Sequence, residues 1–258
     1  MNWFPQIGSG SLVQLPLHRR RKWRAIENES ESGERISLPD VSAGQIEWRL
    51  SYQDLSETEL DKISVLYAAA RGRFGSFAFA DPIANLLVWS EDLARPVWQS
   101  GLLSVSGPYF EFPGSDPSWT LVNRSPGEQS LSQTVELSGD YVACFSAFLR
   151  SESRATVLIA RDQTQSVAPI GPEWKRVFVS GPGDGSTDRS TFSIALAPGQ
   201  TVEVKGLQLE AQPYPSKYKP TAGESRVYEE TYFGADELTV TSTGPGLFAC
   251  ELMLVSRV

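Results

Sequence analysis

Short runs in which apolar and polar residues alternate recur along the chain, separated by residues that favour turns. The clearest is the run from Ile46 to Gln53, in which every second residue is apolar. A period of two places alternate side chains on opposite faces of a β-strand. The 21 glycines and 17 prolines are scattered between such runs and form no biased tract, as in all-β proteins with many turns. We therefore predict a mainly β protein with at most one helix.

That helix is predicted over about residues 56–71. Ser56 and Glu59 have the spacing of a capping box, in which each side chain binds the backbone N–H of the other residue. Apolar residues then follow at helical spacing up to Ala70, and Gly72 stands where a glycine commonly ends a helix.

The segment before residue 30 is predicted to be extended, with a break at Pro16, and it carries a run of basic residues. Charged side chains fall on both faces of the second extended piece, which is typical of an edge strand or of a strand in a subunit interface. A simple solvated surface is the alternative, and the pattern does not decide between them. The basic residues of the run are Arg19, Arg20, Arg21, Lys22 and Arg24. We expect a polar turn at 28–34, strands at 44–54 and 74–79, and a stop at Asp81-Pro82.

From Asn85 onward charge becomes rarer and short strands recur with no helical stretch between them. This pattern predicts a β-sandwich of the jelly-roll type. The expected strands cover residues 101–106, 109–112, 130–137, 141–150, 155–160, 175–180, 191–196 and 201–209.

Three more strands are predicted at 226–233, 237–242 and 247–255. A remnant of about 35 residues cannot bury a core alone, so we expect it to pair with the N-terminal part. The prediction is a discontinuous β-sandwich domain with one α-helix, of residues 1–82 plus 222–258, which carries an inserted jelly-roll β-sandwich of residues 83–221.

Composition excludes several classes of function. A net charge of −8 argues against nucleic-acid binding. No stretch approaches the roughly 18 to 20 apolar residues of a spanning helix, and residues 1–10 do not resemble a secretion signal, so we expect a protein made in the cytoplasm without membrane insertion. Cys144 and Cys250 are expected to be buried thiols. With His18 as the single histidine, no zinc set can form and no cofactor is expected, which leaves only an oxygen-ligand calcium site open.

The 181–188 stretch, Gly-Pro-Gly-Asp-Gly-Ser-Thr-Asp, is rich in glycine but lacks the Lys-Ser/Thr of a P-loop and the final Glu of an EF-hand loop. We expect a turn between two strands. His18 has no Ser, Cys or carboxylate at catalytic spacing, and no Asp or Glu stands in a recognisable catalytic setting, so we expect a protein that is not an enzyme.

The order of elements in residues 15–82 resembles that of the minor tail protein M family of lambdoid phages and the related distal tail proteins. It comprises a basic strand, a polar turn, an alternating strand ending at Tyr52, a helix from Ser56, and an aromatic strand closed by Pro82. Residues 238–241 and 247–255 are similar to that family's closing pair. The resemblance implies a structural virion protein: a homo-hexameric ring at the virion tail tip, between the tail tube protein and the tail-tip hub of the baseplate. Head-to-tail rings need two complementary patches on each subunit, and the basic run is a candidate for one.

The insertion resembles the carbohydrate-binding-module-like sandwiches of phage tail proteins, on residues 85–93 with Trp98 at its start and 206–221 at its end. The resemblance implies contact with a host cell-surface glycan. Trp89, Trp98 and Trp174 are expected in the sandwich core or at its base. The residues near turns, expected to be exposed for stacking on sugar, are Tyr109, Trp119 and Tyr214. A receptor-binding or carbohydrate-binding tail fibre protein, or a glycan hydrolase, are the alternatives.

Overall fold

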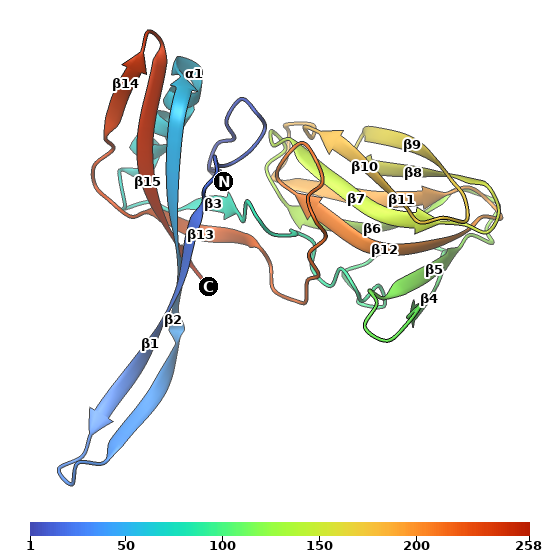
Figure 1. Cartoon of the computed structure of the whole chain (residues 1–258), viewed down its shortest axis with the longest axis horizontal. Coiled ribbons are helices and arrows are strands. Elements are labelled where there is room, and N and C mark those ends of the chain that lie inside the picture. The colour runs from blue at the N-terminus through green and yellow to red at the C-terminus, as the bar shows by residue number, and fades with distance from the viewer. The chain divides into compact units, whose positions relative to one another are not determined.

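The computed structural model describes residues 1–258, apart from the side chains of residues 41 and 42. The chain is mainly β, with sandwich-like antiparallel sheets and the helix α1 (Glu57–Ala70), which confirms the predicted fold class. It divides into two compact units, shown in Figure 1. Unit 1 comprises residues 1–8, 12–79 and 228–258, and unit 2 comprises residues 9–11 and 80–227. The divisions predicted from the sequence lie after residues 82 and 221.

Unit 1 is built on one antiparallel sheet in the order β1-β2-β15-β13-β3, with β14 paired to β15. Two of the three C-terminal strands, β13 and β15, therefore pair with N-terminal ones, and β15 runs along β2 from Leu247↔Ser56 to Arg257↔Gln45. The strands are β1 (His18–Glu29), β2 (Arg35–Ser56), β3 (Phe77–Ala80), β13 (Val227–Phe233), β14 (Val240–Gly244) and β15 (Leu247–Arg257).

Aromatic side chains fill the core of unit 1. Trp48 and Tyr52, from the alternating run of β2, are fully buried. The Trp48 indole N–H donates to Ser256 Oγ over 3.1 Å, and the Tyr52 hydroxyl donates to the Leu12 carbonyl over 2.6 Å. Phe79 packs edge-on against Trp48. The alternation therefore gives β2 a buried face, and each polar group buried with it has a partner, as a stable core requires.

Helix α1 begins at the predicted capping box. Ser56 is the N-cap, the Glu59 N–H donates to Ser56 Oγ, and the Ser56 N–H donates to Glu59 Oε2 over 2.8 Å. The helix ends in left-handed backbone at Arg71 and Gly72, where the Gly72 N–H donates to the Tyr67 carbonyl. The predicted span of 56–71 is confirmed, because local capping chemistry fixes both ends.

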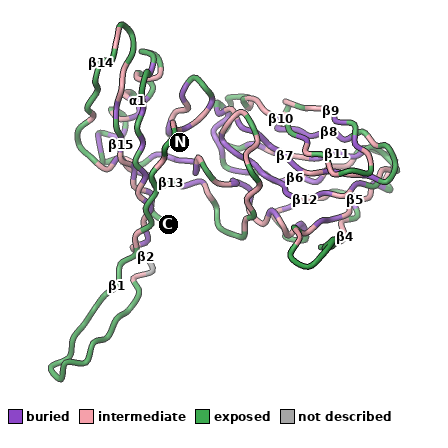
Figure 2. The backbone as a smooth tube through the Cα atoms, viewed as in Figure 1, coloured by how far each residue is buried: buried purple, intermediate pink, exposed green. Residues whose placement is uncertain are grey.

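Unit 2 is a sandwich of two antiparallel sheets, one ordered β10-β7-β12-β5-β4 and the other β6-β11-β8-β9. Figure 2 shows buried residues along the strands that face each other and exposed ones in the connections. Phe145 of β7 and Phe192 of β11 meet in the core with ring centroids 5.8 Å apart. The strands are β4 (Ser104–Tyr109), β5 (Ser118–Val122), β6 (Gln129–Glu136), β7 (Ala143–Arg150), β8 (Ala155–Arg161), β9 (Thr164–Ile170), β10 (Lys175–Gly181), β11 (Arg189–Leu196) and β12 (Thr201–Glu210).

The predicted strands differ from the structure in four places, the first of which is β2, because it begins at Arg35 and not at residue 44. Residues 109–112 are irregular beyond Tyr109, because they lie between Pro108 and Pro113, and proline cannot donate to a strand ladder. β5 and β9 were not predicted. β9 contains Pro169, which an edge strand tolerates, and β9 pairs only with β8.

Candidate functional site

Two features stand out as candidates for function: a β-hairpin arm in unit 1 and a polar groove in unit 2. The arm is the outer part of the β1–β2 pair. β1 pairs with β2 out to Glu29↔Arg35, whereas β15 accompanies β2 only as far as Gln45. Residues 24–40 therefore form a two-stranded ribbon, seen at the lower left of Figure 1.

The arm exposes apolar side chains on one face. Ile26 lies directly opposite Leu38, and Ile36 follows on the same face opposite Asn28. Ile26 is 46 % exposed, and Ile36 and Leu38 are each 53 % exposed. Trp23, where the strand register shifts, is 65 % exposed. An isolated two-stranded ribbon cannot bury such side chains by itself, so this face is suited to contact with another protein surface.

The structure sorts the predicted basic run into two groups. Lys22 forms an ion pair with Glu47 and Arg24 with Asp40, and the Arg19 guanidinium lies 5.5 Å from the centre of the Trp48 ring. Those three cations thus make contacts within the arm or at its root, the part of β1 from His18 to Lys22. Within the described part of the chain, the exposed Arg20 and Arg21 take part in no ion pair.

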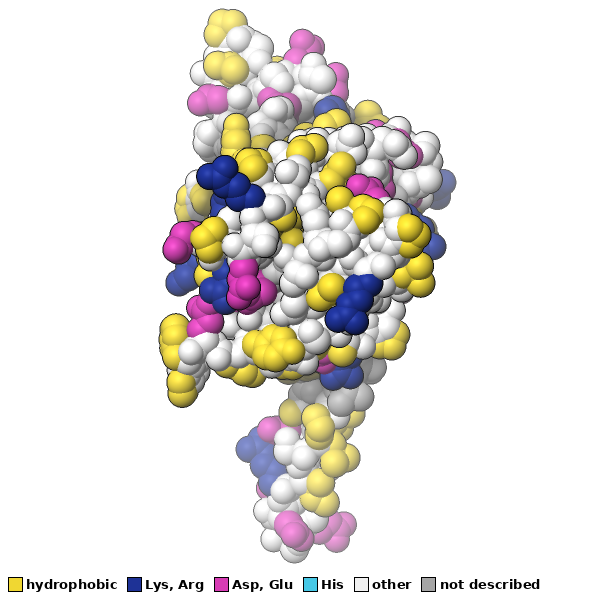
Figure 3. Space-filling model, turned by 90° about the vertical axis from the view of Figure 1, so that its right-hand side faces the viewer, with side chains coloured by type: hydrophobic (Ala, Val, Ile, Leu, Met, Phe, Trp, Pro, Cys, Tyr) yellow, Lys and Arg dark blue, Asp and Glu magenta, His cyan; other side chains and the backbone are white. Residues whose placement is uncertain are grey.

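Acidic residues gather at the other end of the arm. Glu27 pairs with Arg35, and the exposed Glu29, Glu31 and Glu34 form no ion pair among the described residues. Figure 3 shows the arm at the bottom of the view, with hydrophobic side chains along one side, basic ones on the other and acidic ones at the tip. The arm therefore has a basic root, an apolar face and an acidic tip.

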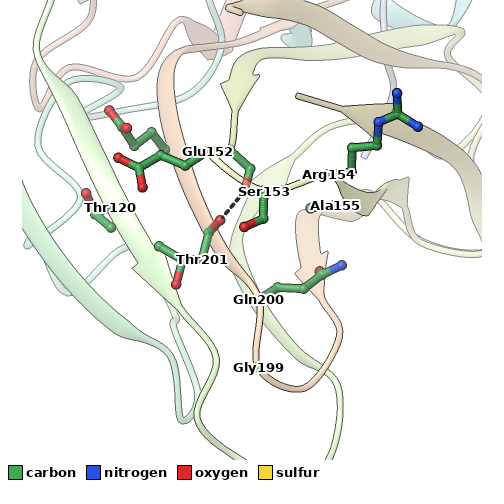
Figure 4. Close-up of a pocket in the computed structure, with 10 residues that line it drawn as sticks. Thr120, Glu152, Ser153, Arg154, Ala155, Gly199, Gln200 and Thr201 are labelled. Atoms are coloured by element: carbon green, nitrogen blue, oxygen red, sulfur yellow. Dashed lines mark hydrogen bonds between the residues drawn. The ribbon is translucent and has the colours of Figure 1, made fainter. Parts of the chain in front are cut away.

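The second feature is a groove of about 500 Å³ at one end of the sandwich in unit 2. It is lined by Thr120 of β5, by the β7–β8 connection with the start of β8 (151–155), by the β11–β12 connection with the start of β12 (199–201), and by Glu203. Figure 4 shows Glu152 and Thr120 on one side of the groove and Arg154 and Gln200 on the other. The Ser151 hydroxyl donates to the Thr201 carbonyl over 2.7 Å, which ties the two connections together. The lining offers hydroxyl, amide, carboxylate and guanidinium groups.

A web of charged side chains continues from the groove across the outer face of the β10-β7-β12-β5-β4 sheet. Arg150 bridges Glu203, at 2.8 Å, and Glu111, at 2.6 Å. The Trp174 indole N–H donates to Glu111 over 2.8 Å, and the Arg150 and Lys205 cations lie 4.4 Å and 4.3 Å from the centre of its ring. The hydrogen bond from Trp174, with the nearby cations, lowers the pKa of Glu111, and the bond to Glu203 raises the pKa of Arg150. This half-buried position corrects the expectation that Trp174 lies in the sandwich core or at its base.

The other end of the same sheet face is covered by residues 212–221. Glu210 is buried there and accepts from Ser216, and the Lys219 ammonium lies 3.1 Å from it. Arg176 donates to the Ser216 carbonyl. The groove and the web around Trp174 are therefore the part of this face that the covering segment leaves open.

The three residues predicted to stack on sugar differ in their exposure to solvent. Tyr109 is 52 % exposed at the end of β4, and Tyr214 is 71 % exposed in the covering segment. The expectation for Trp119 was wrong, because its ring is buried and its N–H donates to the Glu91 carbonyl over 3.0 Å. None of the three lines the groove. Trp98 is buried and Trp89 is half-buried, and the Trp98 N–H donates to the Trp89 carbonyl.

The groove residues escaped sequence analysis because they are Ser, Thr, Gly, Gln and Glu in loops with no motif spacing. Figure 3 shows small, mixed groups of hydrophobic and charged side chains on the face of the sandwich turned to the viewer. The 182–188 segment connects β10 to β11, as predicted.

Among the described residues, no group of three or more His, Cys, Asp or Glu side chains is placed to hold a metal ion. In the same residues no helix has the length and apolar character needed to cross a membrane.

No protein-family model matches the chain, and no curated protein sequence matches it. Among solved structures, the chain is similar to the enzymatically active domain of tailspike protein 4 of bacteriophage CBA120, with 13% identity and a TM-score of 0.39. That match covers 51% of this chain and 22% of the tailspike chain, so the chain spans about a fifth of its length.

Two carbohydrate-binding modules are similar as well. The CBM22-1 xylan-binding domain of Paenibacillus barcinonensis Xyn10C matches with 11% identity and a TM-score of 0.41, over 49% of this chain and 94% of that one. The C-terminal family 22 module of Clostridium thermocellum Xyn10B matches with 14% identity and a TM-score of 0.41, over 53% and 99%. At such TM-scores these likenesses assign no function to the chain.

Proposed function

We propose that this chain is a structural subunit of a virion tail tip, which assembles through its arm into a ring between the tail tube and the tip complex. The observation that carries the proposal is the arm, a two-stranded ribbon with exposed Ile26, Ile36 and Leu38 on one face. The order of elements in unit 1, which resembles that of distal tail proteins, supports the same assignment.

The energetics favour a partner for the arm. Burying a whole Ile or Leu side chain stabilises by about 1.5–3 kcal/mol, and these three are about half exposed. Covering them therefore contributes on the order of 1 kcal/mol each, or roughly 3 kcal/mol for each arm. Repeated at every subunit of a closed head-to-tail ring, a contact of this size stabilises the whole assembly.

The test is the mass and shape of the purified full chain in solution. We expect light scattering to give about 170 kDa, six times the 28.4 kDa of one chain, and negative-stain images to show rings. The variant Ile26→Thr, Ile36→Thr, Leu38→Thr should run as a monomer with an unchanged circular dichroism spectrum. A matched control is Val167→Thr, at an exposed apolar residue of β9 in unit 2. A wild-type chain that stays monomeric at tens of micromolar would contradict the proposal.

The groove of unit 2 favours a second function, the binding of a host-surface glycan. Sugars are recognised by several polar groups that converge in a concave site, and the groove combines Thr120, Glu152 and Gln200 with a web of fixed charges beside it. In this proposal the site binds a glycan and does not cleave it. Six copies of a weak site in one ring would act through avidity.

A glycan array probed with the full chain tests this second function. Glu152→Ala and Thr120→Val are each expected to weaken binding about tenfold, the loss of one hydrogen bond of about 1.4 kcal/mol. Ser186→Ala, in the connection between β10 and β11, should leave binding unchanged. Equal binding by all three variants would remove the groove from the proposal, and release of sugar products would favour a glycan hydrolase.

A further inference from the structure

We infer that the acidic tip of each arm docks on the basic root of the arm of a second copy of this chain. The inference rests on the proposed function and names the contact by which neighbouring subunits join. It requires two matching surfaces on one chain, here called the tip patch and the root patch.

The root patch combines cations with exposed apolar side chains. Arg20 and Arg21 are exposed on β1 and point to opposite faces of it, so together they border its outer edge, which has no neighbouring strand among the described residues. The Arg21 guanidinium lies 5.8 Å from the centre of the Trp23 ring. Trp23 and Val258 both approach Gly44, where an added Cβ would meet each of them at 3.1 Å. Trp23 is 65 % exposed and Val258 is 45 % exposed, so the root offers an apolar surface bordered by positive charge.

The tip patch has the same composition with the opposite charge. Glu29, Glu31 and Glu34 surround the turn of the hairpin, where the Glu34 N–H donates to Ser30 Oγ and fixes the turn. The apolar face of Ile26, Ile36 and Leu38 adjoins it. Glu31 and Glu34 lie at the turn that ends this apolar strip, and Glu29, opposite Arg35, lies on the other face of the hairpin. The carboxylates at the tip and the apolar strip complement the cations and apolar surface of the root.

The tip of an arm cannot neutralise the root of the same arm. Arg20 and Glu29 are nine residues apart on one strand, and at about 3.3 Å per residue this is roughly 30 Å. Salt screens charges over about 10 Å at physiological ionic strength. The complementary charges can therefore meet only when the arms of different copies overlap.

The arrangement also explains why both patches lie on the arm. Tip-on-root contact is heterologous, since each subunit uses one patch toward one neighbour and the other patch toward the next, which is the requirement for a ring. A polyanion such as a nucleic acid would match the root patch alone and would leave the tip patch without a role.

Charge exchange tests the inference on the full chain. The tip variant is Glu29→Lys, Glu31→Lys, Glu34→Lys, the root variant is Arg20→Glu, Arg21→Glu, and the exchange variant carries all five substitutions. We expect the tip and root variants each to lose at least tenfold in assembly affinity. The exchange variant, and an equimolar mixture of the tip and root variants, should assemble again, because in both an acidic patch meets a basic one. Restored assembly would also show that the substituted chains fold.

Three outcomes separate the possibilities. If the wild type does not assemble, the proposed function fails. If the wild type assembles and the tip and root variants assemble equally well, only the tip-on-root contact is overturned. If both variants fail to assemble, and neither the exchange variant nor the mixture recovers while circular dichroism shows folded chains, the pairing of these two patches is again overturned. A control with Glu128→Lys and Glu173→Lys, at exposed positions of unit 2, should assemble as the wild type does.

Discussion

Arg161 allows a sharp test of what stabilises the sandwich of unit 2, because its guanidinium is buried at the end of β8 with 1 % of its surface exposed. It donates to backbone carbonyls from three places: Tyr141, Gly181 at 2.8 Å and Ser138 at 3.2 Å. Its Nε and Nη2 also donate to the Ser190 hydroxyl. One side chain thus joins the β6–β7 connection to the ends of β10 and β11.

The perturbation is Arg161→Met, which keeps the apolar stem and removes all the donors. Burial lowers the pKa of Arg161, and the charge of Asp162 opposes that effect, yet a guanidinium remains charged in proteins. Each carbonyl left without a donor costs about 1–3 kcal/mol, reduced where water can enter. We expect a net loss of about 3–5 kcal/mol, as for other broken buried charge networks, a large part of the 5–15 kcal/mol typical of a domain.

The assay is native-state hydrogen exchange of the β8 and β11 amides in the full chain, which reports on unit 2 separately from unit 1. Arg189→Met is the matched control on β11, since that arginine pairs with Glu136 at the surface, with side chains 67 % and 48 % exposed, and such pairs contribute about 0–1 kcal/mol. An Arg161→Met variant within 1 kcal/mol of the control would refute the argument that these donors hold the connections together.

Three further predictions concern the helix cap and the thiols. Ser56→Ala should cost about 1 kcal/mol through loss of the N-cap, measured by hydrogen exchange in α1. The pKa of Glu59 is lowered by its hydrogen bonds to Ser56 and Gly8, so its contribution to the free energy of unfolding is present above the ordinary pKa of 4.5 and is lost as the pH falls through the lowered value. In Glu59→Gln, the free energy of unfolding measured in urea should therefore fall less steeply at acid pH. Burial raises the pKa of Cys144 to about 12 and that of Cys250 to about 11, so neither should react with a thiol reagent at pH 8 until the chain is unfolded in urea.

Sequence reasoning succeeded where local chemistry decides the structure. The alternation around Trp48 predicted a half-buried strand, and the capping box at Ser56 predicted where α1 begins. The return of the C-terminal strands to the N-terminal part, where β15 pairs with β2, followed from a packing argument, because three strands cannot bury a core without further elements. In each case a regular pattern or a simple energetic need sufficed.

It failed where the decisive contact is made by residues distant in sequence. Trp119 stands among turn-forming residues, yet its burial depends on the Glu91 carbonyl, 28 residues earlier. The groove forms from two connections and two strand residues, and these carry no pattern of their own. The position of Trp174 is likewise set by Glu111 and Arg150, which only the sheet topology brings to it.

The sequence did not predict the second strand of the arm for a different reason, and that reason bears on function. Residues 35–43 were not predicted as part of β2, because the alternation of Ile36 and Leu38 with polar residues is interrupted at Pro39-Asp40, which are residues typical of turns. Regular alternation over a whole strand reflects burial of one face within the same chain, so a strand that is buried only by another molecule need not show it. Such a strand can keep Ile36 and Leu38 exposed on one face and carry charged residues elsewhere. The long β2 of this structure therefore extends beyond what its own core requires. If the arm serves assembly, other subunits should cover the part of β2 that the sequence pattern did not predict. Hydrogen-exchange protection of residues 24–40 should then rise on assembly, while that of β15 stays unchanged.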